Sequence, residues 1–307
     1  MNIKKPILSL VKEIAQKLST AYPDPLLCEQ YAWWTLESIL GVNQATLLAH
    51  PTFELSGHHE KQLAHWLDQL INHHQPIQYL IGSVPFGNLD ILVKPPTLIP
   101  RPETEEWCLW LIEQLKSLQT KNLTIIDIGS GTGCIALSLA YAFPHATVYA
   151  VDCSDSALEL TLSNIRHTGV KNITVIKSDV FDTIAHNLHV DLIVSNPPYI
   201  AYEEWSTLDA SVKQWEDKGA LLAPDNGLAV IQKIIIQATR HIRTHPALKS
   251  MNIPQVIIEI GYKQADAVMH LMKVAHYNNI GVRKDLEGKD RIVFGRIDHV
   301  AITAHTQ

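Results

Sequence analysis

The N-terminal part of the chain carries apolar residues at the spacing of amphipathic helices. They recur three and four positions apart, with polar residues between them, so that they share one helix face. The stretches with this pattern are residues 7–18, 26–40, 45–50 and 54–72. Gly41 follows the second stretch as a helix stop, and the tryptophans in these stretches are typical of a core. We therefore expect residues 1–75 to form an all-helical domain.

The helical spacing is lost in the next segment, residues 76–100. Pro76 to Gly82 and Phe86 to Val93 are short apolar runs separated by turn residues, which is typical of a β-hairpin or two short strands. We interpret this segment as a linker between two domains. A helix is predicted next, over residues 105–118, because prolines and acidic residues precede it and favour a helix start.

From residue 123 onward, patterns of buried strands alternate with patterns of helices. The predicted strands are residues 123–128, 147–151, 173–176, 190–194, 255–260, 280–284 and 291–296. The predicted helices are residues 134–143, 155–167, 228–242 and 264–275. Ser154 and Gly169 flank the second of these helices as cap residues. The alternation predicts the α/β fold class, with a doubly wound, Rossmann-like sheet covered by helices on both faces.

Composition and charge argue against several classes of protein. With 307 residues the chain exceeds one typical domain, and its net charge of −6 provides no basic field for nucleic acid. The four cysteines show no Cys-x-x-Cys spacing, as expected for reduced thiols in a cytoplasmic protein. We expect neither a signal peptide nor a membrane span. Adjacent histidines at 58–59 and 73–74 are interpreted as solvated surface, and no metal site is predicted.

A glycine-rich loop follows the first strand of the alternating region. Its sequence is Asp127-Ile128-Gly129-Ser130-Gly131-Thr132-Gly133. Glycines allow a tight turn and a close approach to a ligand, and backbone N–H groups at a helix start can meet an anionic or polar group. The spacing differs from the Gly-x-Gly-x-x-Gly of dinucleotide sites. Asp127, directly before the loop, would suit a cationic group such as the ammonium of an amino acid.

Acidic residues end the next two strands. Asp152 follows the second strand, where a carboxylate can accept both hydroxyls of a ribose. Asp179 follows the third strand and can bind the exocyclic amine of an adenine, with Val180 and Ile135 as apolar candidates for the faces of the ring. Open α/β sheets bind ligands at the carboxyl ends of their strands. Together with Asn196 at the end of the fourth strand, this set favours S-adenosylmethionine over NAD as the cofactor.

The fourth strand runs into Asn196-Pro197-Pro198-Tyr199. Because neither proline has an N–H, this turn offers carbonyl acceptors and few donors. The side chain of Asn196 adds another carbonyl, and Tyr199 adds a flat wall. Such a cup suits a planar –NH₂ group, whose two N–H bonds would be held by acceptors. The alternative interpretation is a strand-terminating turn with a buried tyrosine.

A second unusual loop contains Arg101 between two prolines, followed by Glu103. Two prolines around one arginine indicate a loop of fixed shape, which would suit substrate binding. The alternative is an exposed ion pair between Arg101 and Glu103 at a helix start, which would contribute little.

These motifs together resemble those of a known enzyme family. The glycine loop, Asp152, Asp179 and the Asn-Pro-Pro-Tyr turn resemble the class I, S-adenosylmethionine-dependent methyltransferases that act on planar nitrogen. Within that class, narrower motifs resemble the peptide chain release factor N5-glutamine methyltransferases (the HemK or PrmC family). These motifs are residues 76–82 with 86–87, residues 98–105, residues 258–262 with Gln264, and residues 285–293. The resemblance covers roughly residues 76 to 296.

The resemblance implies an organisation and an activity. It implies a helical substrate-recognition domain at 1–75, a β-hairpin linker at 76–100 and a seven-stranded methyltransferase domain at 101–307. The implied partners are class I peptide chain release factors, whose Gly-Gly-Gln glutamine would be methylated, and we expect a monomer. The family usually has Glu-Pro where this chain has Glu216-Asp217, which puts the shape of the loop from 203 to 227 in doubt.

The expected mechanism follows from the acceptors in the Asn-Pro-Pro-Tyr turn. Asn196 Oδ1 and the Pro197 carbonyl would accept the two N–H bonds of the glutamine amide. Tyr199 would pack against the amide plane, and Pro198 would stiffen the loop. Arg101 and Glu103 are further candidates for substrate binding.

Three alternatives stay open. One is the sister family that methylates a glutamine of a ribosomal protein and shares the Asn-Pro-Pro-Tyr motif. Another is an adenine N6-methyltransferase of DNA or RNA, since an adenine amino group is also a conjugated –NH₂. No stripe of Lys, Arg and aromatic residues supports a direct nucleic-acid substrate. The last is a methyltransferase fold that only binds a partner, which could lack cofactor binding.

Overall fold

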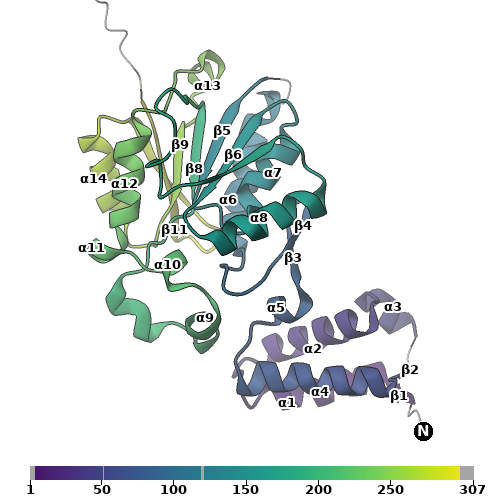
Figure 1. Cartoon of the computed structure of the whole chain (residues 1–307). Helices are drawn as coiled ribbons and strands as arrows, with labels where there is room; N and C mark the ends of the chain where they lie inside the picture. Colours follow the sequence, from purple (N-terminus) through teal and green to yellow (C-terminus); the bar gives the residue numbers. More distant parts are fainter. Residues whose placement is uncertain (1–3, 51, 119–120, 298–307) are drawn as a thin grey trace, which may run out of the picture. The chain divides into compact units, whose positions relative to one another are not determined.

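The computed structural model describes residues 4–50, 52–118 and 121–297. The chain divides into two compact units (Figure 1). The first contains Met1–Ser83 and Asp209–Trp215, and the second contains Val84–Leu208 and Glu216–Gln307.

The first unit is built mainly from helices, and the apolar faces of all but the last of them meet in one core. The helices are α1 (Ile7–Leu18), α2 (Pro25–Leu40), α3 (Gln44–Ala49), α4 (Gly57–Asn72), α5 (Ile77–Ile81) and α9 (Ala210–Trp215). Asp24 and Ser56 cap α2 and α4 through their side chains, and Gly41 ends α2 in the left-handed conformation, as predicted. The buried apolar cluster extends from Ile7 to Ile77 along the chain.

Two expectations for this region are wrong. The unit is not all-helical, because β1 (Lys4–Pro6) and β2 (Thr52–Glu54) pair antiparallel. Strands of three residues are too short to show an alternating pattern. Residues 77–81, expected as a strand, form the helix α5, which Gly82 ends at a φ of +92°. A short apolar run fits either a strand or a helix by periodicity alone.

The hairpin is made of β3 (Ser83–Phe86) and β4 (Leu89–Leu92) and, apart from Ser83, belongs to the second unit. Its turn is fixed by the Gly87 N–H, which donates to Glu105 Oε1 at 2.8 Å. Asn164, which is fully buried, binds both backbone groups of Leu92 and also donates to the Thr132 carbonyl. One amide side chain therefore connects the hairpin with the glycine-rich loop.

A seven-stranded sheet forms the centre of the second unit. The strand order is β10-β11-β9-β8-β5-β6-β7. The strands are β5 (Thr124–Ile128), β6 (Thr147–Asp152), β7 (Ile173–Lys177), β8 (Leu192–Ser195), β9 (Val256–Glu259), β10 (Asn278–Lys284) and β11 (Asp290–Arg296). All neighbours are parallel except β11, which runs antiparallel to β9 and β10. This confirms the predicted doubly wound α/β fold.

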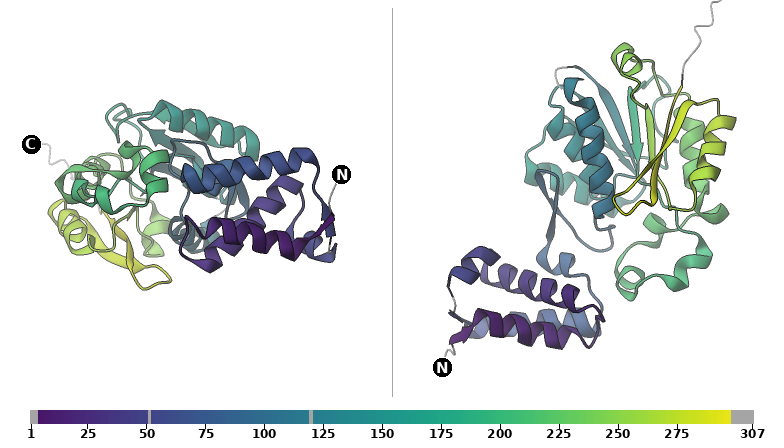
Figure 2. Two further views of the ribbon diagram at one scale, coloured as in Figure 1. Left: turned by 90° about the horizontal axis from the view of Figure 1, so that it is seen from below. Right: turned by 180° about the vertical axis from the view of Figure 1, so that it is seen from behind.

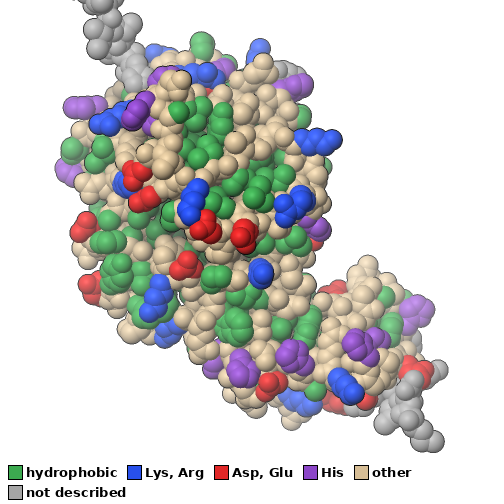
Figure 3. Space-filling model, viewed as in Figure 1, with side chains coloured by type: hydrophobic (Ala, Val, Ile, Leu, Met, Phe, Trp, Pro, Cys, Tyr) green, Lys and Arg blue, Asp and Glu red, His purple; other side chains and the backbone are tan. Residues whose placement is uncertain are grey.

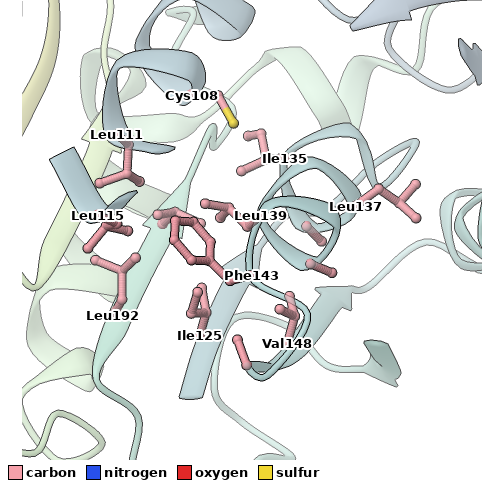
Figure 4. Close-up of a cluster of buried hydrophobic side chains, with 14 of the residues drawn as sticks. Cys108, Leu111, Leu115, Ile125, Ile135, Leu137, Leu139, Phe143, Val148 and Leu192 are labelled. Carbon is pink, nitrogen blue, oxygen red and sulfur yellow. The ribbon is translucent and has the colours of Figure 1, made fainter. Parts of the chain in front are cut away.

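Helices cover both faces of this sheet (Figure 2). One face packs against α6 (Pro102–Leu115), α7 (Cys134–Ala142) and α8 (Asp155–Thr168), and the other against α12 (Ala229–Ala238) and α14 (Ala265–Val274). Figure 4 shows part of the first apolar layer around Phe143. The remaining elements are η1 (Lys116–Leu118), η2 (Tyr202–Thr207), α10 (Lys218–Leu221), α11 (Pro224–Gly227) and α13 (Pro246–Ser250).

No helix within the described residues is long and apolar enough to span a membrane.

Candidate active site

A cavity opens where β5, β6, β7 and β8 end, and it has a volume of about 920 Å³ including the part open to solvent. The strand ends contribute Ile128, Gly129, Asp152, Cys153, Ser178, Asp179, Ser195 and Asn196 to its lining. Further lining comes from Thr97, Leu98, Gly131, Ser154, Ser156, Ala157, Val180, Pro197, Pro198, Asp217, Gly219, Ala220, Val230 and Ile234. A mostly apolar cleft with a few converging polar groups is the usual form of a small-molecule site.

The glycine-rich loop is closed by hydrogen bonds within the protein. The N–H groups of Gly129 and Ser130 both donate to the Val151 carbonyl, and the Gly131 N–H donates to Asp152 Oδ2 at 2.9 Å. The N–H groups of these three residues, which precede the start of α7, are therefore bonded within the protein. Gly129 and Gly131 line the cavity with φ values of +74° and +57°, which favour glycine and let the backbone form the wall.

Asp152 lines the cavity and is held firmly. Its Oδ1 accepts the Ser154 N–H at 2.9 Å, and its Oδ2 accepts the Gly131 N–H. Burial raises the pKa of this carboxyl above its usual value, although hydrogen bonds from backbone N–H groups partly offset this effect. Each carboxylate oxygen retains lone pairs for a ligand hydroxyl.

Asp127 lies outside the lining of the cavity and is fully buried. Its Oδ2 accepts the Ala136 N–H at 3.1 Å, at the start of α7. Burial raises the pKa of Asp127 to about 7. Within the described residues, its Oδ1 and the buried Ser130 hydroxyl have no hydrogen-bond partner.

Ser130, Thr132 and Gly133 also lie behind the cavity wall. Gly133 has a φ of +81°, and a Cβ there would lie 2.9 Å from the Thr161 side chain on α8. Thr161 in turn donates to the Gly131 carbonyl at 2.9 Å. These residues shape the loop from behind, so we do not propose direct ligand contacts for them.

Asp179 and Val180, the residues that we expect to bind an adenine, both line the cavity. Asp179 Oδ2 lies 2.8 Å from Lys233 Nζ, and Val180 is almost fully buried. Ile135 was expected beside Val180, and this is wrong. It lies in the apolar cluster between α7 and the sheet (Figure 4), because its position on α7 faces the strands.

The Asn-Pro-Pro-Tyr turn follows β8 directly. Asn196, Pro197 and Pro198 line the cavity, whereas Tyr199 lies outside the lining. The Tyr199 hydroxyl donates to Glu259 Oε1 at 3.3 Å. Burial, followed by the charge of Glu259, raises the pKa of Tyr199.

The backbone of Tyr199 is held by two further elements. Its carbonyl accepts Gln264 Nε2 at 2.9 Å, and Gln264 also binds the Gly261 N–H and the Asn226 carbonyl. A Cβ on Gly227 would lie 1.9 Å from the Tyr199 carbonyl oxygen. Only glycine fits this close approach.

A buried hydrogen-bond chain supports Asn196, and sequence reasoning missed it. Asn196 Nδ2 donates to Thr104 Oγ1 at 3.0 Å, and Thr104 Oγ1 donates to Glu259 Oε2 at 2.7 Å. Trp107 Nε1 donates to the same oxygen at 2.7 Å. Glu259 is 1% exposed, and burial raises its pKa above the usual range. An acid within the apolar strand β9 was the available signal.

Arg101 pairs with a residue other than Glu103. Its Nη2 lies 2.6 Å and 2.7 Å from the two carboxylate oxygens of Glu216, which is almost fully buried. Next to this pair, the Asp217 N–H donates to the Pro96 carbonyl at 2.8 Å. Neither Arg101 nor Glu103 lines the cavity. Glu103 lies near Tyr199, whose pKa it helps to raise.

The face shown in Figure 3 carries Lys and Arg side chains interspersed with Asp and Glu, with no continuous basic band. Within residues 4–50, 52–118 and 121–297, no group of three or more His, Cys, Asp or Glu side chains is placed to hold a metal ion.

Two family models match the chain. Residues 9–82 match the PrmC N-terminal domain, and residues 108–249 match the methyltransferase small domain. Among solved structures, the catalytic domain of hMettl16 in complex with MAT2A 3′UTR hairpin 6 is similar, with a TM-score of 0.52 at 15% identity. The similarity covers 82% of this chain and 87% of that chain, and it shows the fold alone.

Curated relatives give the family. A release factor glutamine methyltransferase of Enterococcus faecalis is 37% identical over 254 residues, which is 82% of this chain and 86% of the relative. Another, of Flavobacterium psychrophilum, is 34% identical over 285 residues, which is 92% of this chain and 95% of the relative. With these relatives and the matching N-terminal model, the chain belongs to the release factor glutamine methyltransferase family.

Proposed function

We propose that this protein transfers a methyl group from S-adenosylmethionine to the side-chain amide nitrogen of the glutamine in the Gly-Gly-Gln loop of class I release factors. Family membership supports the reaction. The observation that carries it is the pair of acceptors at the end of β8. Neither Asn196 Oδ1 nor the Pro197 carbonyl has a hydrogen-bond partner among the residues that the structure describes. Both residues line the cavity.

The residues of the cavity fit this cofactor. Asp152 offers lone pairs on both carboxylate oxygens for the ribose hydroxyls, and Asp179 and Val180 offer an acceptor and an apolar surface for the adenine. The unpartnered Oδ1 of Asp127 is a buried acceptor behind the glycine loop. When bound, S-adenosylmethionine would supply the methyl group as an electrophile.

The chain itself would orient the glutamine amide. An amide nitrogen is a poor nucleophile because its lone pair is delocalised into the carbonyl. Asn196 Oδ1 and the Pro197 carbonyl would accept its two N–H bonds, which fixes the nitrogen and raises its electron density. The gains are orientation and preorganised dipoles rather than removal of a proton by a base before attack. Pro198 would keep the turn rigid, and Tyr199 would support it from behind.

The test is mass spectrometry of a class I release factor after incubation with this protein and S-adenosylmethionine. We expect one added methyl group on the Gly-Gly-Gln glutamine, lost in Asn196→Ala, while cofactor binding in calorimetry is largely retained. Asn187→Ala is the matched control, because Asn187 is exposed and lies outside the cavity lining. No methylation by the wild type, with cofactor bound, would refute the proposed substrate. Normal turnover of Asn196→Ala would refute the role of the amide.

A further inference from the structure

We propose that Thr104, held by Glu259, is a positioning residue that determines which end of the Asn196 amide faces the substrate. This inference deepens the proposed function and rests on it. It concerns the orientation of one side chain whose two ends differ only in being a hydrogen-bond donor or an acceptor. Only the orientation with the oxygen toward the cavity can receive an N–H bond of a glutamine amide.

The orientation follows from counting protons along the chain. Glu259 Oε2 is the end of the chain, because the Trp107 indole N–H can only donate and already donates to this oxygen at 2.7 Å. Thr104 has a single hydroxyl proton, and its Oγ1 lies 2.7 Å from Glu259 Oε2. The proton is therefore used toward Glu259, and Thr104 can only accept from its other neighbour. That neighbour is Asn196, 3.0 Å away, which must present its –NH₂.

Glu259 is kept as an acceptor by its surroundings. Trp107 Nε1 and Thr104 Oγ1 donate to Oε2, and the Tyr199 hydroxyl donates to Oε1. Thr104 is the third residue of α6, a helix of 14 residues whose positive end favours a nearby carboxylate. A buried carboxylate with three donors is satisfied as an acceptor, whereas an unpaired one would be unfavourable. The chain thus starts at a fixed acceptor and ends at Asn196.

Without the Thr104 hydroxyl, no hydrogen bond from this position favours one orientation of the Asn196 amide over the other. In the reversed orientation, –NH₂ would face the –NH₂ of the substrate, and two donors cannot bond. The Pro197 carbonyl would then hold the substrate nitrogen alone. A misplacement of a reacting group by about 1 Å can lower turnover on the order of 10²-fold.

Two substitutions at one position separate positioning from packing. Thr104→Val keeps the shape of the buried side chain and removes the hydroxyl, whereas Thr104→Ser keeps the hydroxyl and removes a methyl group. We expect kcat for the release factor to fall about 10²-fold in Thr104→Val, with unchanged cofactor affinity, and to stay near wild type in Thr104→Ser. The reverse order, with Thr104→Val active and Thr104→Ser impaired, would show that Thr104 only packs.

A readout that needs no substrate keeps the inference separate from the proposed function. In protein labelled with ¹⁵N at asparagine, the Asn196 side-chain N–H signals are identified by their loss in Asn196→Asp. We expect one proton with the shift and slow exchange of a hydrogen bond in the wild type and Thr104→Ser, and its loss in Thr104→Val. Identical signals in all three proteins would overturn the inference. Failure of the wild type to methylate a release factor, with these signals as expected, would overturn the proposed substrate alone.

Discussion

The substitution Gly227→Ala tests how closely the Asn-Pro-Pro-Tyr turn is held. A Cβ at this position would lie 1.9 Å from the Tyr199 carbonyl oxygen and 2.6 Å from its carbonyl carbon. Real Cβ contacts are not shorter than about 3.0 Å, so one of the two backbones must move by about 1 Å. Neither can yield by a side-chain rotation, because both clashing atoms belong to the main chain.

The expected effect of Gly227→Ala has two parts, a loss of stability and a loss of turnover. The φ of +81° at Gly227 is left-handed, which disfavours alanine by about 1–2 kcal/mol. The displacement of the turn adds a loss of turnover, on the order of 10²-fold for a shift of about 1 Å. The assay compares the unfolding free energy, cofactor affinity and kcat for release factor methylation between Gly227→Ala and the wild type.

Gly169→Ala provides a matched control for this experiment. Gly169 ends α8 with a φ of +73°, and a Cβ there would meet nothing within 4 Å. Backbone strain should lower the unfolding free energy of both variants by a similar amount. Only Gly227→Ala should also have a lower kcat. Equal turnover of the two variants would refute the reasoning that Gly227 sets the position of the turn.

Two further predictions concern Asp127 and Asp217. The pKa of Asp127 is raised from 3.8 to about 7, so the folded state binds more protons than the unfolded state between these values. Asp127 therefore contributes to the free energy of unfolding below pH 4. This contribution, up to about 4 kcal/mol, should be lost as the pH rises to 7. Denaturation by urea should show this loss in the wild type and not in Asp127→Asn. If the unfolding free energies of the two proteins changed in parallel with pH, the prediction would be contradicted. Asp217→Pro fits the φ of −67°, but it removes both the N–H that binds the Pro96 carbonyl and the carboxylate that accepts the Gly219 N–H, so stability should fall by about 1–3 kcal/mol. Loss of cofactor affinity in calorimetry would show that the departure from the family pattern matters.

The fold and the residues at the strand ends of the site could be predicted from the sequence, because their signals are local. Ser154 and Gly169 cap α8 as expected, since capping depends on a few neighbouring residues. Asp152, Asp179 and Asn196 reach one cavity because each follows a parallel strand, and such strands end at the same edge of the sheet. These positions can be read from the pattern of strands alone.

The remaining features depend on contacts between distant residues. The sequence indicated that Arg101 lies in a fixed loop, but its partner Glu216 is 115 residues away. Thr104 and Glu259 are separated by 155 residues and meet where α6 packs against β9. The direction of the Asp127 side chain could not be predicted for another reason. Asp127 precedes the glycine loop, yet its position in β5 turns the side chain to α7 rather than to the cavity. The direction of a side chain at a strand end depends on one residue of register.

The strand order has a consequence for how the cavity arises during folding. Strands β5, β6 and β7 are consecutive along the chain and can pair through local crossovers, whereas Val194 in β8 pairs with Asp127 in β5 across 67 residues. Closing that long loop costs more chain entropy than closing the local crossovers. Asn196 and both prolines arrive only with β8, so an intermediate that lacks this strand has half a binding site. A ligand of the cavity would therefore select the fully assembled sheet and shift the folding equilibrium toward it by mass action.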